Sequence, residues 1–373
     1  ALLEEAGLPQ GLVQVVTGPG RSVGTAIIET ADYVMFTGST ATGRTVARHA
    51  GERLIGMSAE LGGKNAMVVT EDVDLDRAVE GAVVGSFANT GQLCISIERL
   101  YVNEKIADDF VDAFGARTSE LTLGAEQAYG PEVGALASQD QLDKVRAHVD
   151  DAVAKGARVV AGGRHRPDIG ELFYEPTVLA GVTPDMALYR EETFGPVVAV
   201  YPVASDDEAV AQVNDTEYGL NASVYCGDTD RGKAIAERIR AGTVNVNDGY
   251  SSAWASLDAP MGGMKASGLG RRHGREGLLK YTESQTVAVR SALAAKLQDP
   301  GRDGAGYARR FTAILRKAKY LPREATRRGR ARVHCVRAEV SDLGDSRCPN
   351  SNVATSPLGA HGARAPIMSP PSR

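Results

Sequence analysis

Two side chains in this sequence, the carboxylate of Glu60 and the thiol of Cys94, could share one reaction. Each lies beside glycines, in Glu60-Leu61-Gly62-Gly63-Lys64 and in Gly91-Gln92-Leu93-Cys94, where backbone can approach a ligand closely. A cysteine attacks as a thiolate, and an ordinary pKa of about 8.5 leaves little of that form at neutral pH, so activation is required. We expect a loop after Gly91 that leads into a helix, with backbone N–H groups directed at Cys94. Glu60 could then deprotonate a water.

Taken singly, each residue has a simpler interpretation. A lone cysteine is more often a small core residue, and a lone glutamate is usually solvated. The elements between the two look like scaffold: residues 65–69 predict a buried strand, and residues 74–87 carry apolar side chains at helical spacing.

The N-terminal part predicts two β-turn-α units. In the first, Leu12–Thr17 is the strand, and a glycine-rich turn from Gly18 leads into a helix through Ile28. In the second, Tyr33–Phe36 is the strand, Gly38–Thr40 the turn and Gly43–His49 the helix. Their repetition predicts parallel strands. The first turn lacks the G-x-G-x-x-G spacing, so it is weak support for dinucleotide binding.

Ser39 at the second turn has two interpretations of equal weight. Its hydroxyl and the N–H groups of a helix start could hold a phosphate oxygen, or it could simply cap the helix.

The rest of the chain also alternates helices and strands, which predicts an α/β class. The expected helices are 104–121, 139–155, 206–214 and 230–240, and the expected strands include 158–160, 197–201 and 242–246. Arg271, Arg272, His273 and Arg275 could form an anion site, but a solvated helix start is the commoner explanation.

Composition sets broad limits. The chain has 373 residues, of which 43% are hydrophobic and 24% charged, and a net charge of −5. These values are typical of a globular protein with two or three structural units, and they give no electrostatic reason for nucleic-acid or membrane binding. Four scattered cysteines favour a reducing compartment, so we expect a cytoplasmic location. We see neither a spanning segment nor a secretory signal.

Four motifs, in order, resemble the aldehyde dehydrogenase superfamily between about Leu2 and Arg290. They are Phe36-Thr37-Gly38-Ser39-Thr40, Glu60-Leu61-Gly62-Gly63-Lys64, Gly91-Gln92-Leu93-Cys94 and Glu191-Glu192-Thr193-Phe194-Gly195-Pro196. Within the superfamily, residues 94–99 and 219–223 are similar to succinate-semialdehyde dehydrogenases.

The resemblance implies a partial Rossmann-like cofactor domain and an α/β catalytic domain of the aldehyde dehydrogenase type. We assign residues 1–62 to the first and 63–257 to the second. Residues 258–290 form a return segment whose strand, Val287–Val289, pairs across a subunit interface in the family, so a homo-oligomer is expected. Residues 291–373 form a basic helix, from Ala308 to Lys319, and a tail predicted to be disordered.

The resemblance also implies the roles of single residues. Cys94 is the nucleophile and Glu60 the water-activating base in oxidation of a small aldehyde, with succinate semialdehyde favoured. Glu192 binds the ribose of NAD or NADP, and Phe194 packs against the nicotinamide. The remaining expected cofactor contacts are Gly38, Ser39, Gly43 and Leu61. No metal is needed.

The sequence departs from the family in two ways. The family's oxyanion asparagine, its ribose-binding lysine and its cofactor-phosphate strand all precede the point where this chain begins, so we expect truncation at the N-terminus. Ala88 stands where several succinate-semialdehyde enzymes have an arginine that binds the substrate carboxylate. An alternative is therefore an inert paralogue that acts as a pseudoenzyme or interaction protein.

The last fifty residues leave other possibilities open. His334, Cys335 and Cys348 lack the paired spacing of a zinc site, so we expect no metal there. Clustered arginines allow nonspecific nucleic-acid contact as a third hypothesis, and a frame-shifted end competes with it.

Overall fold

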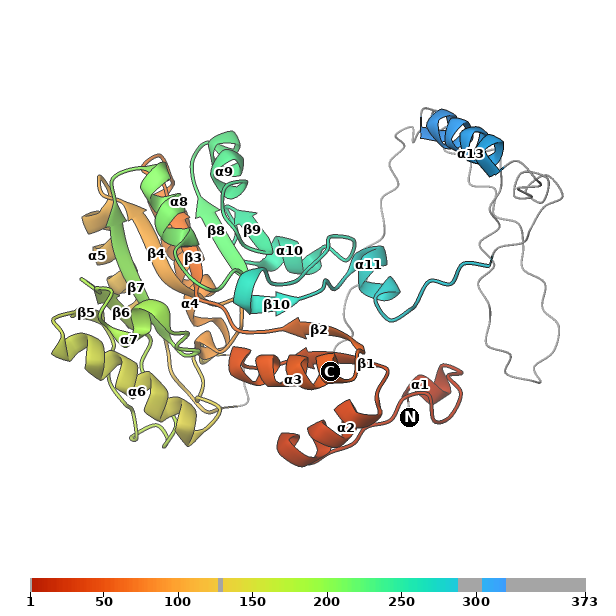
Figure 1. The fold of residues 1–373 in the computed structure, drawn as a ribbon. Coiled ribbons are helices and arrows are strands. Elements are labelled where there is room, and N and C mark those ends of the chain that lie inside the picture. The colour runs from red at the N-terminus through yellow and green to blue at the C-terminus, as the bar shows by residue number, and fades with distance from the viewer. Residues whose placement is uncertain (1, 127–129, 288–303, 320–373) are drawn as a thin grey trace, which may run out of the picture. The chain divides into compact units, whose positions relative to one another are not determined.

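The computed structural model describes residues 2–126, 130–287 and 304–319. It divides into two units, Ala1–Gln285 and Thr286–Arg373, which are described separately. The first unit contains both sheets and every expected site residue (Figure 1).

The larger sheet of the first unit has seven strands in the order β5-β6-β7-β4-β3-β8-β9. All neighbours are parallel except β5 and β6, as the alternation of helices and strands predicts. The strands are β3 (Asn65–Val69), β4 (Ile97–Asn103), β5 (Arg158–Ala161), β6 (Thr177–Ala180), β7 (Val197–Val203), β8 (Asn221–Tyr225) and β9 (Thr243–Val246).

Helices cover both faces of this sheet (Figure 1). Alternate residues of β3 point to opposite faces: Met67 and Val69 pack with α4 (Leu75–Phe87) and α5 (Ala107–Ser119). Ala66 and Val68 belong to the cluster on the other face. That face is covered by α6 (Gln139–Ala154), α8 (Asp206–Asn214) and α9 (Thr229–Ala236).

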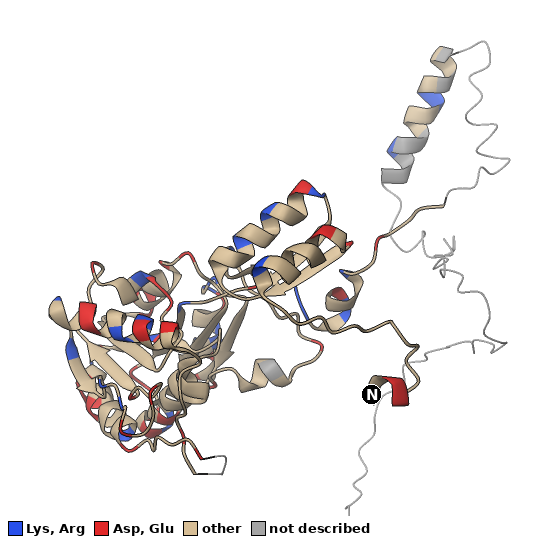
Figure 2. Cartoon of the chain, turned by 90° about the horizontal axis from the view of Figure 1, so that it is seen from below, with Lys and Arg blue, Asp and Glu red and all other residues tan. Residues whose placement is uncertain are grey.

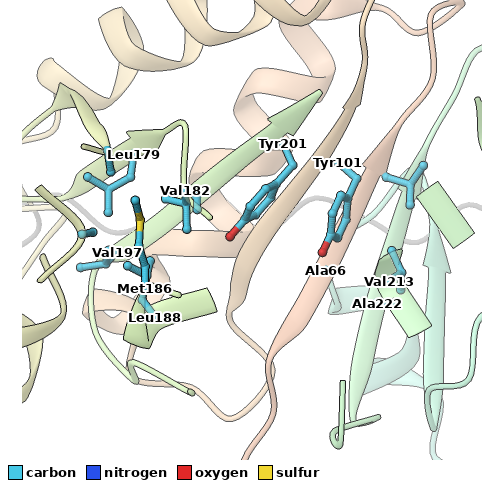
Figure 3. Close-up of a cluster of buried hydrophobic side chains, with 14 of the residues drawn as sticks. Ala66, Tyr101, Leu179, Val182, Met186, Leu188, Val197, Tyr201, Val213 and Ala222 are labelled. Atoms are coloured by element: carbon cyan, nitrogen blue, oxygen red, sulfur yellow. The ribbon is translucent and has the colours of Figure 1, made fainter. Parts of the chain in front are cut away.

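Two tyrosines stack within the second of these clusters. The rings of Tyr101 and Tyr201, from β4 and β7, have centroids 5.2 Å apart (Figure 3). Burial of apolar side chains on both faces fixes the parallel strands, so the loops at their ends have a rigid base.

The smaller sheet has the order β1-β2-β10. β1 (Tyr33–Thr37) is parallel to β2 (Gly56–Glu60), and β10 (Gly268–Leu269) is antiparallel to β2. Helices α2 (Thr25–Thr30) and α3 (Thr40–Glu52) pack with this sheet through Ile28, Val34 and Val46. β2 ends at Glu60, and β3 of the larger sheet begins five residues later.

The second β-turn-α unit is confirmed by β1 and α3, but the strand predicted at Leu12–Thr17 is wrong. Leu12, Val13 and Val15 are exposed and form no strand. A strand is stabilised by neighbours that take its hydrogen bonds, and the structure gives this segment no pairing partner within the described ranges.

Two helices begin or end differently from the prediction. The helix expected at 104–121 starts at Ala107, because Glu104 donates its N–H to Val203 in a turn after β4. The helix expected at 230–240 is α9 and ends at Ala236. Among the described residues of the first unit, the remaining α-helices are α1 (Leu2–Glu5), α7 (Ala187–Arg190), α10 (Ser251–Ala255) and α11 (Gly274–Leu279). A π-helical turn, Gly20–Gly24, precedes α2, and a 3-10 turn, Lys265–Ser267, precedes β10.

In the second unit, α13 (Gly304–Lys319) includes the helix predicted from Ala308. The tail from Arg323, the three residues considered for metal and Ala288–Val289 of the expected interface strand lie outside the described residues. Within the described ranges every helix is too short or too polar to cross a bilayer. Acidic and basic residues are interspersed over the helices and loops (Figure 2).

Candidate active site

Glu60 ends β2 at the point where the chain passes from the smaller sheet to the larger one. Its side chain is buried. Its carbonyl accepts a hydrogen bond from the N–H of Gly38 at 3.2 Å, and the next N–H, of Leu61, donates to Ser267 at 2.9 Å. Backbone hydrogen bonds therefore join the C-terminal end of β2 to the β1–α3 turn and to the glycine-rich segment before β10.

Cys94 lies in a turn between a 3-10 turn, Ala88–Gly91, and β4. The helix expected after Cys94 is therefore wrong, because the residues that follow form a fully buried strand. A side chain at Gly91 would overlap the carbonyl of Gly195, and its φ of 66° also favours glycine. The 3-10 turn that precedes Cys94 thus packs directly against Gly195 and Pro196.

Asparagine side chains hold the backbone of the Cys94 turn. Nδ2 of Asn65 donates to the carbonyls of Cys94 and Ser96 at 2.8 and 2.9 Å, and its Oδ1 accepts from the N–H of Asn221. Nδ2 of Asn221 donates to Ile95, and its Oδ1 accepts from Asn245. A buried network with its partners satisfied restricts movement, so the backbone of Cys94 is fixed from β3 and β8.

Glu192 contacts the Leu61–Lys64 segment. Its Oε1 accepts the N–H of Gly63 at 2.9 Å. A Cβ at Gly62 would overlap Oε2 of Glu192, and one at Gly63 would come within 3.0 Å of the Cys94 carbonyl. Gly62 therefore leaves room for Glu192, and Gly63 for the backbone of Cys94, on the segment that directly follows Glu60.

A buried ion pair supports the segment that carries Glu192. Nζ of Lys64 lies 2.5 Å from Oε2 of Glu98, and Glu98 also accepts the backbone N–H groups of Thr193 and Phe194 at 2.9 to 3.0 Å. Phe194 has a φ of 56°, a backbone conformation that needs such support.

The Cys94 thiol and the Glu60 and Glu192 carboxyls all have raised pKa values. Burial raises the pKa of the Cys94 thiol, and the charges of Glu60 and Glu192 raise it further. Burial also raises the pKa of Glu60, although nearby basic side chains, Arg272 above all, oppose this. Burial with the charge of Glu98 raises the pKa of Glu192 to about 7. The expected lowering of the Cys94 pKa by a helix start is thus not found; its own N–H lowers it less than burial raises it.

The residues expected to contact the cofactor lie beside this centre. Ser39 is the N-cap of α3, with its hydroxyl accepting the N–H of Thr42, so the capping interpretation is realised. Gly43 packs on Leu61, whose methyl groups would meet any Cβ there. A cleft of about 840 Å³ opens alongside, lined by Ile28, Val34, Phe36, Thr42 and Val46 among others.

This arrangement suits a dinucleotide. The cleft is apolar enough for a base and opens beside the turn at the start of α3. The Glu192 carboxylate, held by one N–H, retains oxygen lone pairs for two ribose hydroxyls. Among the described residues no group of three His, Cys, Asp or Glu side chains could hold a metal ion.

Sequence reasoning missed the supporting residues. Asn65 and Asn221 each begin a buried strand, and a polar residue at that position was the available signal. Lys64 and Glu98 are 34 positions apart, so nothing in the sequence indicated that they pair.

Residues 1–287 match the model of the aldehyde dehydrogenase family. A protein of Mycolicibacterium smegmatis, named "Putative succinate-semialdehyde dehydrogenase" with NADP(+) as the cofactor in its name, is 57% identical over 322 residues, 86% of this chain and 62% of that one. This similarity extends past Arg290, the point at which the resemblance carried by the four motifs ends. The 3-sulfolactaldehyde dehydrogenase of Pseudomonas putida is 39% identical over 78% of this chain and 59% of its own length.

Solved structures agree. An NAD-dependent aldehyde dehydrogenase from Sinorhizobium meliloti has a TM-score of 0.73 at 38% identity, over 76% of this chain and 56% of that one. Betaine aldehyde dehydrogenase from Staphylococcus aureus in complex with NAD+ has a TM-score of 0.70 at 34% identity, over 75% and 56%. The chain thus spans about three fifths of the length of the proteins it matches.

Proposed function

The chain belongs to the aldehyde dehydrogenase family, and on this premise we propose that it oxidises a small aldehyde to its carboxylic acid with NAD+ or NADP+. The observation that carries the proposal is the convergence of Glu60, Cys94 and Glu192 on the Leu61–Lys64 segment. This convergence requires glycine at two positions of that segment.

Cys94 acts as the nucleophile. Its thiol first gives its proton to water. The thiolate then attacks the aldehyde carbon and forms a thiohemiacetal, whose oxyanion accepts the N–H of Cys94 itself. Loss of hydride from that carbon leaves a thioester on the sulfur. The Asn65 network supports this role because it holds the carbonyl of the same residue.

Glu60 acts in the second half of the reaction. Its carboxylate takes a proton from water, the resulting hydroxide adds to the thioester carbonyl, and the carboxylic acid leaves as the thiolate re-forms. A base with a pKa raised toward neutrality is suited to this step, and burial moves Glu60 in that direction.

Glu192 binds the ribose on the nicotinamide side of the cofactor, Phe194 packs beside the ring, and Gly38, Ser39, Gly43 and Leu61 line the approach from the cleft. A nicotinamide bound there supplies the hydride acceptor. NADP+ is the favoured form because the Mycolicibacterium relative is named for it.

Succinate semialdehyde is the favoured substrate, on the names of the relatives that share 55 to 60% identity with this chain. The inert paralogue is the weaker alternative, because those relatives are named as dehydrogenases. A cytoplasmic location, a homo-oligomer and the domain limits at residues 62, 257 and 290 stay predictions.

An aldehyde panel tests the proposal. The complete protein is mixed with each aldehyde and NADP+ or NAD+, and formation of the reduced nicotinamide is followed by absorbance. We expect the highest kcat/KM with succinate semialdehyde and no turnover in Cys94→Ala. Absence of turnover with every aldehyde, or full activity of Cys94→Ala, contradicts it.

A further inference from the structure

The guanidinium of Arg272 lies within ion-pair distance of the carboxylate of Glu60. Its backbone pairs with Met261 in both directions, at 2.9 and 2.6 Å, which fixes where its side chain begins. Nη2 donates to Oγ1 of Thr37 at 2.6 Å, and Nε lies 3.5 Å from Oε1 of Glu60. The guanidinium thus bridges the end of β1 and the end of β2.

The Nε atom of Arg272 is buried and makes no hydrogen bond within the described part of the chain. It is within ion-pair distance of Glu60, which is itself buried. The solvated helix start that the sequence favoured is therefore wrong for Arg272, whose side chain is 30% exposed, but it describes Arg275, which is exposed.

Several basic side chains lower the pKa of Glu60 against the effect of burial. Arg272 has the largest such effect, followed by Lys280, Arg271 and His273. Two of the other cations are held elsewhere: Nη1 of Arg271 donates to the carbonyls of Gly263 and Gly270, and Nζ of Lys280 donates to Ser58.

We propose that Arg272 is a positioning residue for Glu60. Arg272 keeps the Glu60 carboxyl ionised and in place for activation of water, and Thr37 anchors Arg272. The inference rests on the proposed function, since it concerns the same hydrolytic step. A cation next to a carboxylate favours its charged form and lowers its pKa by one to three units. Removal of Arg272 therefore weakens the opposition to the effect of burial and raises the pKa of Glu60, so that Glu60 loses its proton only at higher pH.

The test isolates hydrolysis from hydride transfer. p-Nitrophenyl acetate acylates the Cys94 sulfur and releases p-nitrophenolate; water, after giving its proton to Glu60, hydrolyses the thioester to acetate and frees the thiol. No cofactor takes part. The deacylation rate of the complete protein is measured against pH in the wild type, Arg272→Gln, Arg272→Lys and Arg275→Gln.

We expect the midpoint of the acidic limb of this pH–rate profile to move to higher pH, by about one pH unit, in Arg272→Gln. Arg272→Lys, which keeps the charge, moves it by less, and Arg275→Gln, which removes the same charge from an exposed position, leaves it where it was. A folded Arg272→Gln whose midpoint equals that of the wild type overturns the proposal, as does an equal shift in Arg275→Gln. Folding is checked by circular dichroism and a thermal melt.

Thr37→Val gives a second reading if Arg272→Gln does not fold. It keeps the charge and removes the anchor, so the limb moves in the same direction by a smaller amount; an unmoved limb then overturns the proposal. If the proposed role of Cys94 is itself wrong, the result differs: Cys94→Ala still releases a burst of p-nitrophenolate, whatever the Arg272 variants show.

Discussion

Glu192 accepts a hydrogen bond from the backbone N–H of Gly63, at 2.9 Å, although the two residues are 129 positions apart. This contact brings the late acidic segment to the chain that follows Glu60. The space for the Glu192 carboxylate exists because the neighbouring residue, Gly62, has no side chain.

Gly62→Ala is expected to displace Glu192 and weaken cofactor binding. The added methyl group overlaps Oε2 of Glu192, so the carboxylate moves away from the ribose and the KM for NADP+ rises by about tenfold or more, the equivalent of one lost charge-assisted hydrogen bond. Gly51→Ala is the matched control, since a Cβ there meets nothing within 4 Å. Equal KM values in the two variants would argue against the role of Glu192.

Cofactor affinity is expected to fall as the pH is lowered through about 7. In the proposed role, Glu192 accepts the ribose hydroxyls as a carboxylate. Burial raises its pKa to about 7, so protonation below that pH would remove acceptor capacity. Isothermal titration at several pH values measures the Kd. Glu192→Gln binds more weakly and shows a flat profile near pH 7; a variant that keeps the wild-type slope would assign the titration to another group.

The same shift predicts how Glu192 affects stability. The folded protein binds this proton more tightly than the unfolded chain, whose carboxyl has an ordinary pKa. Its contribution to the free energy of unfolding is therefore greatest at low pH and declines as pH rises from about 4.5 to about 7. Urea unfolding of wild type and Glu192→Gln across this range gives a difference that changes with pH.

Asn65→Ala is expected to release the backbone of the Cys94 turn. Two carbonyls and the N–H of Asn221 lose their partner, which costs about 1–3 kcal/mol, and acylation of Cys94 slows. Asn103→Ala is the control, because that buried side chain bonds Lys105 at the far end of β4. Both variants lose stability, but only Asn65→Ala slows the burst with an activated ester.

Lys64→Met is expected to destabilise the protein by about 3–5 kcal/mol, because Glu98 is left as an unpaired buried charge. The double variant Lys64→Met, Glu98→Leu removes that charge and regains stability in urea unfolding. It still loses the bonds to Thr193 and Phe194, so its cofactor affinity stays low. Recovery of both properties would mean that Glu98 does not position the segment.

Local patterns predicted much of the scaffold. The apolar run Asn65–Val69 and the helical spacing after Asp74 correspond to β3 and α4. These patterns were informative because β3 is buried along its whole length and α4 buries one consistent face. Leu12–Thr17 has equally strong strand composition, yet β propensity describes a fit to neighbours, and this segment has none within the described ranges.

Around the site, the limit was long-range pairing. Glu98 and Arg99 interrupt an apolar run and look solvated, yet both are buried because Lys64 supplies an ion-pair partner for Glu98 and a carbonyl for Arg99. The same long-range pairing buries β4, the strand that follows Cys94, where a helix start was expected. The basic cluster near Arg272 could be assigned only after Glu60 was placed beside it.

The most direct test of the central claim is intact-mass analysis of Glu60→Gln after mixing with succinate semialdehyde and NADP+. If Cys94 attacks and Glu60 activates water, the variant forms the thioester but hydrolyses it slowly, and its mass increases by one succinyl group that peptide mapping places on Cys94. Glu60→Gln that turns over at the wild-type rate without an adduct, or an adduct that persists in Cys94→Ala, would contradict the account.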